Sequence, residues 1–379
     1  MTRRERLMAT IHGKPVDRPA VCFYELNGTD QNPDDPDEFN IHSHPSWKPL
    51  LDMTRDYTDR IVMRRMKFTN PYKNIWDLSV CTNTRLPGGK LQMDYAYTLG
   101  ERTFTYRSIR EPDVDTVWNV SCVFKDEDDL EYYLSFPDET VTPVPDISHI
   151  LETERQIGDA GIVCIDVASP LCVVAQYFDM PDFLIIANSN RPLFHKALER
   201  TAQRILLEVE AFAQAAPRRL WRIYGPEYAS APFLPPELFY EYVIKYDKPI
   251  VDAINRSGGF ARIHSHGNLR GIIDYIAGVG YAGMDPIEPP PQGDMELSEV
   301  REKIGKDMVL FGNIEISEIE TLDEIAFAKR VKDAIRDGYS KEGRGFVLMP
   351  TACPLGRVLS PKTVRNYEIM IEAVQTGRF

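Results

Sequence analysis

The 379-residue sequence is 43% hydrophobic and 27% charged, values typical of a soluble globular protein with one large core. Its formal net charge of −13 disfavours phosphate backbones and anionic lipid surfaces, so neither nucleic acid nor a membrane is an expected partner. The N-terminus has no apolar run of a signal peptide, and the six cysteines are scattered along the chain. Together these features indicate a cytoplasmic protein with reduced thiols.

The first third of the chain combines two strands with two unusual segments. After a short helix within the first fifteen residues, apolar runs predict strands at residues 20–26 and 60–66. The polar segment 27–50 is too long for a simple connector, and loops of this length often have a function. In residues 75–125, runs rich in Thr, Tyr and Val are separated by turn signals such as Pro87-Gly88-Gly89, which predicts antiparallel hairpins inserted into the main domain.

From about residue 160 the sequence alternates strands and helices. Helices are expected at 236–258, 268–280 and 296–305, after a capping box that begins at Thr321, and after Ser360-Pro361. The apolar runs between them bring the total to eight strands. This pattern predicts one (β/α)₈ TIM-barrel domain, residues 1–379, with the β-hairpin insertion at 75–125. A doubly wound open sheet is the alternative, but no Gly-x-Gly-x-x-Gly follows the first strand.

Polar residues follow several of the predicted strands. In a TIM barrel the C-terminal ends of the strands carry the catalytic groups. The candidates at these ends are Glu227, His264 with His266, Asp285 with Glu288, Asn313 with Glu315, and Cys353. We take Glu227, Asp285 and Asn313 as candidate catalytic residues.

The sharpest signal is His264-Ser265-His266. Alternate residues of a strand point to opposite faces, so both imidazoles can face one metal only if the chain bends, as Gly267-Asn268 allows. Imidazole together with the thiolate of Cys353 suits zinc. The alternative for the histidines is two hydrogen-bonded or solvated rings, and for Cys353 it is a small buried apolar residue.

These motifs resemble those of the uroporphyrinogen decarboxylase superfamily. The resemblance rests on His264-Ser265-His266-Gly267-Asn268, Gly312-Asn313-Ile314, Cys353 and the opening segment through Val16-Asp17-Arg18-Pro19. It covers most of the chain and is weak at 75–125. True decarboxylases have an arginine-rich segment after the first strand, whereas residues 24–30 here contain no arginine. We therefore reject decarboxylation of a porphyrinogen.

The resemblance instead implies the branch of corrinoid-dependent methyltransferases, which bind zinc through a His-x-Cys pair and a later Cys. By position, His264 and Cys353 match two of these ligands, and His266 stands where the first cysteine is expected. The loss of one negative charge makes Zn²⁺ a stronger Lewis acid, which favours activation of an oxygen leaving group. Glu227 is a candidate further ligand or general acid, and His42, His44 and Tyr224 are candidate substrate-lining residues.

The implied reaction is transfer of a methyl group between a small methylated substrate, such as a methyl ether, and a corrinoid (cobalamin). No corrinoid-binding Asp-x-His-x-x-Gly motif occurs, so the cobalamin would be supplied by a partner protein. Transfer from methylcobalamin to a thiol or a folate is an alternative, as are a zinc-dependent hydrolase and a non-catalytic binding protein. Barrel proteins of this kind often pair, which leaves a homodimer open.

Overall fold

The computed structural model describes residues 1–377, and its centre is one sheet of eight parallel strands. The strands follow the order β1-β12-β11-β10-β9-β8-β7-β2. Their bounds are β1 Ala20–Val21, β2 Arg60–Arg65, β7 Gly161–Ala168, β8 Leu220–Tyr224, β9 Phe260–Ser265, β10 Gly283–Pro286, β11 Val309–Ile314 and β12 Phe346–Pro350. Consecutive strands from β7 to β12 are neighbours in the sheet, as expected for repeated β-α units. The predicted TIM-barrel-like fold is confirmed.

The two ends of this sheet, β1 and β2, meet at Asp59. The backbone N–H of Asp59 donates to the carbonyl of Val21 at 2.7 Å, and the N–H of Val21 donates to the Asp59 carboxylate at 2.9 Å. The same fully buried carboxylate forms ion pairs with Arg6 and Arg18. A single aspartate therefore links the first two strands and the N-terminal helix at the point where the sheet curls onto itself.

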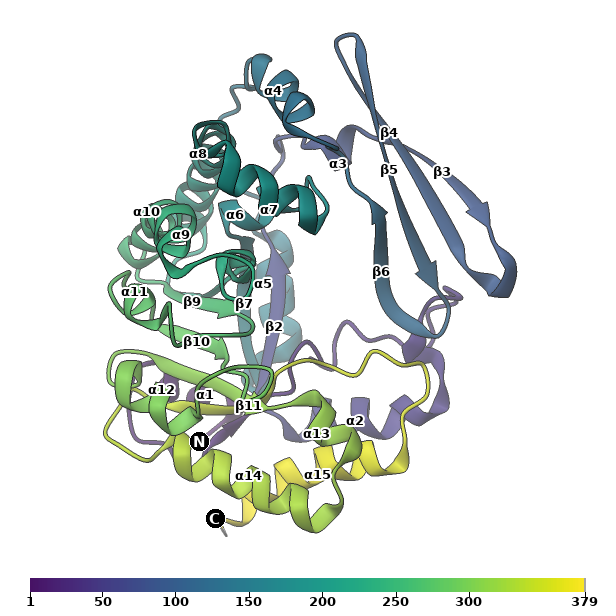
Figure 1. Ribbon diagram of the computed structural model, residues 1–379. Coiled ribbons are helices and arrows are strands. Elements are labelled where there is room, and N and C mark those ends of the chain that lie inside the picture. The colour runs from purple at the N-terminus through teal and green to yellow at the C-terminus, as the bar shows by residue number, and fades with distance from the viewer. Residues whose placement is uncertain (378–379) are drawn as a thin grey trace.

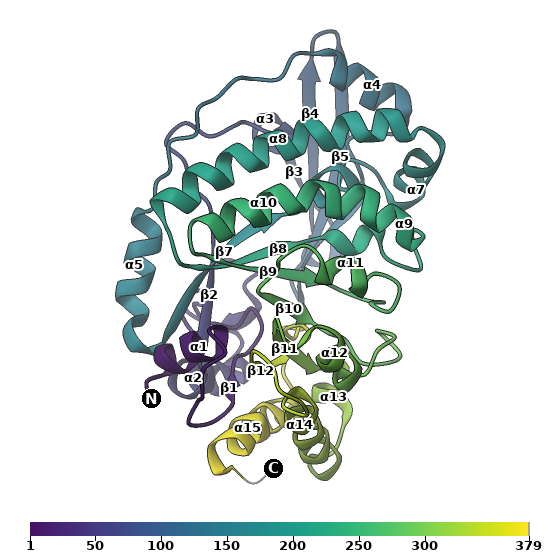
Figure 2. The ribbon, with the colours of Figure 1, turned by 90° about the vertical axis from the view of Figure 1, so that its left-hand side faces the viewer.

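Helices cover the outside of the curled sheet. In Figures 1 and 2, α8 and α10 lie side by side over one part of it, and α14 and α15 lie over another. The inside is filled by a separate apolar cluster that includes Cys22, Cys164, Phe311 and Met349, and Leu7 and Ile11 of α1 belong to it. The helices are α1 Arg3–Ile11, α2 Lys48–Tyr57, α4 Glu127–Ser135, α5 Ser148–Ile157, α6 Pro170–Ala175, α7 Met180–Ser189, α8 Arg191–Ala215, α9 Pro236–Phe239, α10 Lys245–Arg256, α11 Ile273–Ala277, α12 Leu297–Ile304, α13 Ile316–Thr321, α14 Glu324–Gly338 and α15 Pro361–Thr376.

The predicted hairpins form a second, four-stranded antiparallel sheet that stands beside the barrel (Figure 1). After the short helix α3, Ile75–Leu78, its strands are β3 Val80–Arg85, β4 Leu91–Leu99, β5 Arg102–Glu111 and β6 Val114–Ser121. Its β6 end is held by the segment that follows β12, because the N–H of Asp115 donates to the carbonyl of Leu355 at 2.8 Å. Since that segment leaves the C-terminal end of β12, this end of the inserted sheet lies beside the barrel mouth.

Three sequence-based boundaries are wrong. Strand 20–26 is only Ala20–Val21, because the chain turns away before Glu25, which adopts a φ of +57°. The helix expected at 268–280 is reduced to α11, since the Asp294 carboxylate binds the N–H groups of residues 269 and 270 in a turn. Thr321 does not start a helix: it ends α13, and Asp323 caps α14 instead. Among residues 1–377, no helix has both the length and the apolar character needed to cross a membrane.

A buried acid in α10 gives a testable prediction about stability. Asp247 is fully buried, and burial raises its pKa to about 7 although the hydroxyls of Ser169 and Tyr281 donate to it. The neutral carboxyl therefore favours folding at low pH, and this contribution is lost as the pH rises through 7. We compare the free energy of unfolding of Asp247→Asn with that of the wild type. The difference in favour of the variant should be larger at pH 8 than at pH 4, by up to about 4 kcal/mol. Urea unfolding of both proteins at the two pH values measures this, and equal differences would contradict it.

Candidate active site

His264 and His266 lie at the C-terminal end of β9, at the barrel mouth. The strand ends at Ser265, and Gly267 follows with a φ of +78°, a backbone conformation that glycine adopts without strain. This turn brings the two imidazole rings edge to face, with their centroids 4.7 Å apart. The sequence His-x-His thus places both rings in one region instead of on opposite faces of a strand.

Each imidazole has a carboxylate behind it. Nδ1 of His264 lies 2.7 Å from Asp285 Oδ2, and Nδ1 of His266 lies 2.7 Å from Glu288 Oε1. Glu288 is itself fixed by the N–H of Gly267 at 2.6 Å. Burial alone would lower the pKa of His266, but the hydrogen bond with Glu288 outweighs it and raises that pKa. A carboxylate on Nδ1 fixes the tautomer and directs Nε2 outward, which is the usual arrangement behind a metal-binding histidine.

Nε2 of His264 faces a buried tyrosine. The hydroxyl of Tyr24, just after β1, lies 3.2 Å from this nitrogen, and Arg222 of β8 donates to the same hydroxyl oxygen. Arg222 is in turn held by both oxygens of Asp166, at 2.6 and 2.9 Å. With the proton of a neutral His264 on Nδ1, facing the Asp285 carboxylate, Nε2 is an acceptor and the Tyr24 O–H donates to it. A continuous chain of side chains runs from β7 through β8 and β1 to β9.

A second arginine lies behind Asp285. Arg262 is 1% exposed, and its Nε is 2.9 Å from Asp285 Oδ1. The approach does not have hydrogen-bond geometry, and these two atoms have no hydrogen-bond partner among the described residues. The guanidinium also lies over the ring of Phe311, 4.8 Å from its centroid. Burial opposes the charged form of Asp285, but the charges of Arg262 and His264 lower its pKa, so the site holds an ionised carboxylate.

Cys353 and Glu227 are the two remaining residues of the predicted metal-binding set. Cys353 Sγ lies 3.7 Å from Glu25 Oε2, and burial raises the pKa of its thiol, as does the carboxylate of Glu25. Glu227, in the short helix Pro226–Ala229 after β8, has a buried Oε2 with no hydrogen-bond partner among residues 1–377. An unsatisfied buried carboxylate oxygen is costly and marks a position where a ligand or ion could bind.

The other predicted mouth residues have structural partners. Asn313 receives hydrogen bonds from Arg330 of α14 at its backbone carbonyl, 2.6 Å, and at its side-chain oxygen, 3.2 Å. Glu315 accepts from the hydroxyl of Thr351 at 2.9 Å. Tyr224 lies beside His264 in register between β8 and β9. Of Asn313, Glu315 and Tyr224, it is therefore Tyr224 that lies next to His264 in the sheet.

The two loop histidines lie in short helical turns after β1. His42 packs edge to face on Trp47, with 4.7 Å between ring centroids, and burial lowers its pKa. His44 caps the turn Pro45–Trp47, since its Nδ1 accepts from the N–H of Ser46. These contacts fix the positions of both rings, and their role as substrate-lining residues stays a prediction.

The predicted zinc ligands can be compared with the positions of these side chains. Within residues 1–377, no three His, Cys, Asp or Glu side chains are grouped closely enough to hold a metal ion. The donor chemistry nevertheless suits zinc, because both histidines are carboxylate-backed and Glu227 has an unsatisfied oxygen. Zinc at His264 Nε2 would require the Tyr24 hydroxyl to turn away from that nitrogen.

Sequence reasoning missed Tyr24, Asp166, Arg222 and Arg262. The arginines stand in the middle of apolar strands, in Leu220-Trp221-Arg222-Ile223-Tyr224 and Phe260-Ala261-Arg262-Ile263. A charged residue inside a strand that is buried on both faces needs an internal partner. This signal was available from the sequence and would have identified both arginines as part of the barrel interior.

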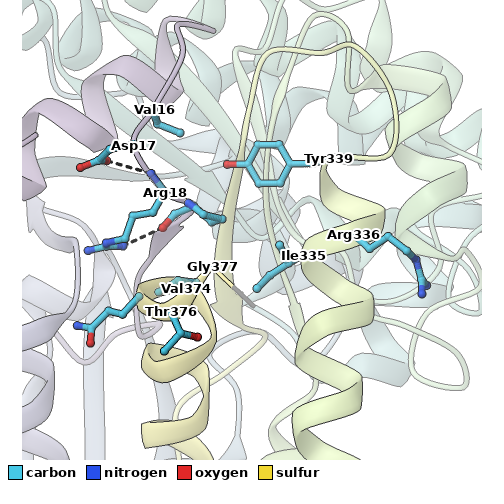
Figure 3. A pocket seen from close by; sticks show the side chains of 11 residues that line it. Val16, Asp17, Arg18, Ile335, Arg336, Tyr339, Val374, Thr376 and Gly377 are labelled. Carbon is cyan, nitrogen blue, oxygen red and sulfur yellow. Dashed lines mark hydrogen bonds between the residues drawn. The ribbon is translucent and has the colours of Figure 1, made fainter. Parts of the chain in front are cut away.

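A different cavity lies at the N-terminal side of the barrel (Figure 3). Its volume is about 620 Å³, and it is lined by residues 16–19, by Tyr339 and by the end of α15. None of the candidate residues contributes to it. Active sites of TIM barrels lie at the opposite, C-terminal face, so we do not assign chemistry to this cavity.

Comparison with known proteins identifies the family. Residues 120–376 match the uroporphyrinogen decarboxylase (URO-D) family, which is more than half of the chain. The chain belongs to the uroporphyrinogen decarboxylase family. This confirms the resemblance inferred from the histidine motif and Cys353. No curated protein sequence matches this member of the family.

One solved structure supports the fold of this uroporphyrinogen decarboxylase family member. A methyltransferase from Methanosarcina mazei is similar over 100% of both chains, with a TM-score of 0.59 and 16% sequence identity. A D-psicose 3-epimerase from Clostridium cellulolyticum H10 covers 60% of this chain and 82% of its own, with a TM-score of 0.36 and 10% identity. At 16% identity the methyltransferase match shows a shared fold, and we draw no conclusion from the epimerase match.

The Tyr24 hydroxyl allows a matched test of the mouth network. Tyr24→Phe leaves His264 Nε2 and one Arg222 nitrogen without this partner, so we expect a loss of about 1–3 kcal/mol in the free energy of unfolding. Tyr367→Phe is the control, because the buried Tyr367 hydroxyl has no hydrogen-bond partner among the described residues. Urea unfolding of the two variants should separate them, and equal losses would contradict the network.

Proposed function

We propose that this protein transfers a methyl group between a small methylated substrate and a corrinoid carried by a partner protein, with zinc as its metal. The observation that carries the proposal is the pair of adjacent, carboxylate-backed histidines at the mouth of a barrel of this family. The methyltransferase from Methanosarcina mazei has a similar fold over the whole length of both chains, which supports a methyltransferase activity. Decarboxylation of a porphyrinogen is disfavoured, because Tyr24, Glu25 and Asp30 follow β1 where arginines would bind substrate carboxylates.

The proposed metal ligands are His264, His266 and Cys353, with Glu227 as a further ligand or a general acid. When bound, zinc stabilises negative charge on the heteroatom that the methyl group leaves. Asp285 and Glu288 hold the two imidazoles through Nδ1 and keep Nε2 available. The Tyr24 hydroxyl holds His264 until a ligand replaces it. In the transfer, the bond between the methyl carbon and its heteroatom would break, and the heteroatom would keep the electron pair and take up a proton, for which Glu227 is the candidate donor. The methyl carbon would form its new bond with an electron pair supplied by the reduced corrinoid of the partner protein.

Two measurements test the proposal. We expect zinc in the purified protein at about one ion per chain, and lower zinc uptake in His264→Ala and in Cys353→Ala. We also expect the absorbance of free Co(I) cobalamin to change when protein and a methyl ether are added together. A protein without metal whose uptake is unaffected by either substitution would refute the metal site. Cleavage of the ether at the same rate without cobalamin would indicate a hydrolase instead.

A further inference from the structure

A cavity of about 520 Å³ opens at the barrel mouth between the ends of β2, β7 and β8. Its inner wall includes Asp166 and Tyr224, which belong to the mouth described above. Tyr224 lies in register with His264, and Asp166 holds the arginine that supports Tyr24. The cavity therefore adjoins the candidate active site through Asp166 and Tyr224, whereas none of the proposed metal ligands lines it, and its volume is within the range of small-molecule pockets.

The cavity has cationic groups without internal partners. Arg65, the last residue of β2, and Lys67 are both exposed and line it. Neither side chain forms a hydrogen bond or ion pair with another described residue, whereas their neighbour Arg64 pairs with Asp30 at 2.7 Å. Two cations without a hydrogen-bonded or ion-paired partner at the exposed rim of a cavity, in a chain of net charge −13, are suited to an anionic ligand.

The acidic groups of the cavity offset these cations only in part. Asp166 is occupied by Arg222 through two hydrogen bonds. Hydrogen bonds from Ser148 lower the pKa of Asp146, and the charge of Lys67 contributes, so Asp146 stays ionised and offsets Lys67 in part. Burial raises the pKa of Glu208 on α8 to about 7, partly offset by Arg204, so much of it is uncharged in neutral solution. An uncharged Glu208 can donate a hydrogen bond to an anion instead of repelling it.

The remaining wall is largely apolar and aromatic. Phe68 and Tyr72 come from the segment after β2, Tyr224 from the end of β8, and the aliphatic members are Val167, Val173 and Ile205. Aromatic side chains bury a flat ring with a preferred geometry and contribute more than their area alone. The combination of an aromatic wall with two free cations is selective for a ring that carries a negative charge.

We propose that this cavity is the substrate pocket and that it binds a small aromatic carboxylate, with Arg65 and Lys67 holding the carboxylate. The inference rests on the proposed function, since it assigns the substrate class of the same active site. An aromatic acid that carries a methyl group on a ring substituent would combine this class of ligand with the methylated substrate of the proposed function.

The test measures binding to the full chain without cobalamin, by calorimetric titration with benzoate, benzamide and cyclohexanecarboxylate. We expect benzoate to bind one per chain and about tenfold more tightly than either analogue, which lack the charge or the aromatic ring. Arg65→Met and Lys67→Met should each weaken benzoate about tenfold. Lys332→Met, which removes an exposed cation of α14, is the matched control and should change nothing.

The acid on α8 gives a second readout. Benzoate affinity should fall as the pH rises through about 7, where Glu208 becomes charged, and Glu208→Gln should remove this dependence. The charged or titratable groups that border Glu208 in the cavity or on its helix are Arg65, Lys67, Tyr72, Asp146, Asp166, Arg204 and Tyr224. Of these groups, Asp166 is paired with Arg222. We expect Glu208 to determine the pH dependence of benzoate affinity between pH 6 and pH 8.

The outcomes separate the pocket from the reaction. Equal affinity for benzoate and benzamide, or equal loss in Lys332→Met and Lys67→Met, would overturn the substrate pocket. Methyl transfer from an uncharged methyl ether without benzoate binding would overturn the pocket but support the proposed function. Benzoate binding that depends on Arg65 and Lys67 without methyl transfer from any donor would support the pocket and refute the function.

Discussion

Asp285→Leu is expected to destabilise the protein by about 3–5 kcal/mol, because it leaves Arg262 as an uncompensated charge inside the barrel. The carboxylate is fully buried and faces both Arg262 and His264, so no water can replace it. Urea unfolding at pH 7 measures the loss. Asp52→Ala, which removes a solvent-accessible carboxylate paired with Lys48 in α2, serves as the control and should leave the free energy of unfolding nearly unchanged.

A second substitution distinguishes the buried charge from a simple cavity. In Asp285→Leu with Arg262→Met, both charges are absent, and most of the lost stability should return. If the double variant is as unstable as the single one, the loss comes from packing or from His264 and the ion pair is not its cause. The coupling between the two positions, measured by the double-mutant cycle, is the decisive quantity.

His264→Ala is expected to lower the rate of methyl transfer by about 10³-fold or more. Under the proposed function it removes a metal ligand, and electrostatic stabilisation by a bound metal contributes several kcal/mol to the transition state. The measurement is the absorbance of Co(I) cobalamin during turnover, at matched protein concentration and with circular dichroism to verify folding. Retention of more than a tenth of the activity would exclude His264 as a metal ligand.

The control for this experiment is His12→Ala. His12 follows α1 near the opposite end of the barrel and packs edge to face on Phe260. It is a histidine of the same chain without a contact to the mouth, so its loss tests any general effect of removing an imidazole. We expect activity within about twofold of the wild type, because surface substitutions away from the site have small effects on folding.

The fold could be predicted from the sequence because its signals are local. Apolar runs of three to five residues mark the first residue of β8, β9, β11 and β12, and they also mark the last residue of β8, whereas β9 and β11 continue two and three residues beyond their runs. The turn residues at 87–89 similarly mark the inserted hairpins. The failures occur where tertiary hydrogen bonds override local patterns, as for Asp294, which holds residues 269 and 270 in a turn.

The candidate site could be predicted only in part. The positions of His264, Asp285 and Glu288 follow from the rule that functional groups stand at strand ends, but their pairing does not. Which carboxylate lies behind which imidazole depends on the stagger between β9 and β10, in which Asp285 is level with His264. Tyr24 was missed because it reaches His264 from a segment 240 residues away.

The closure of the barrel has a consequence for how the chain folds during synthesis. β1 pairs with β12 through Ala20 with Val347, and hydrogen bonds between Val21 and Asp59 join it to the start of β2. The first strand therefore has no sheet partner on one side until almost the whole chain has been translated. Such long-range contacts are formed late, and exposed strand edges favour aggregation in the interval. We infer that the nascent N-terminal segment must be kept from misassembly until β12 leaves the ribosome.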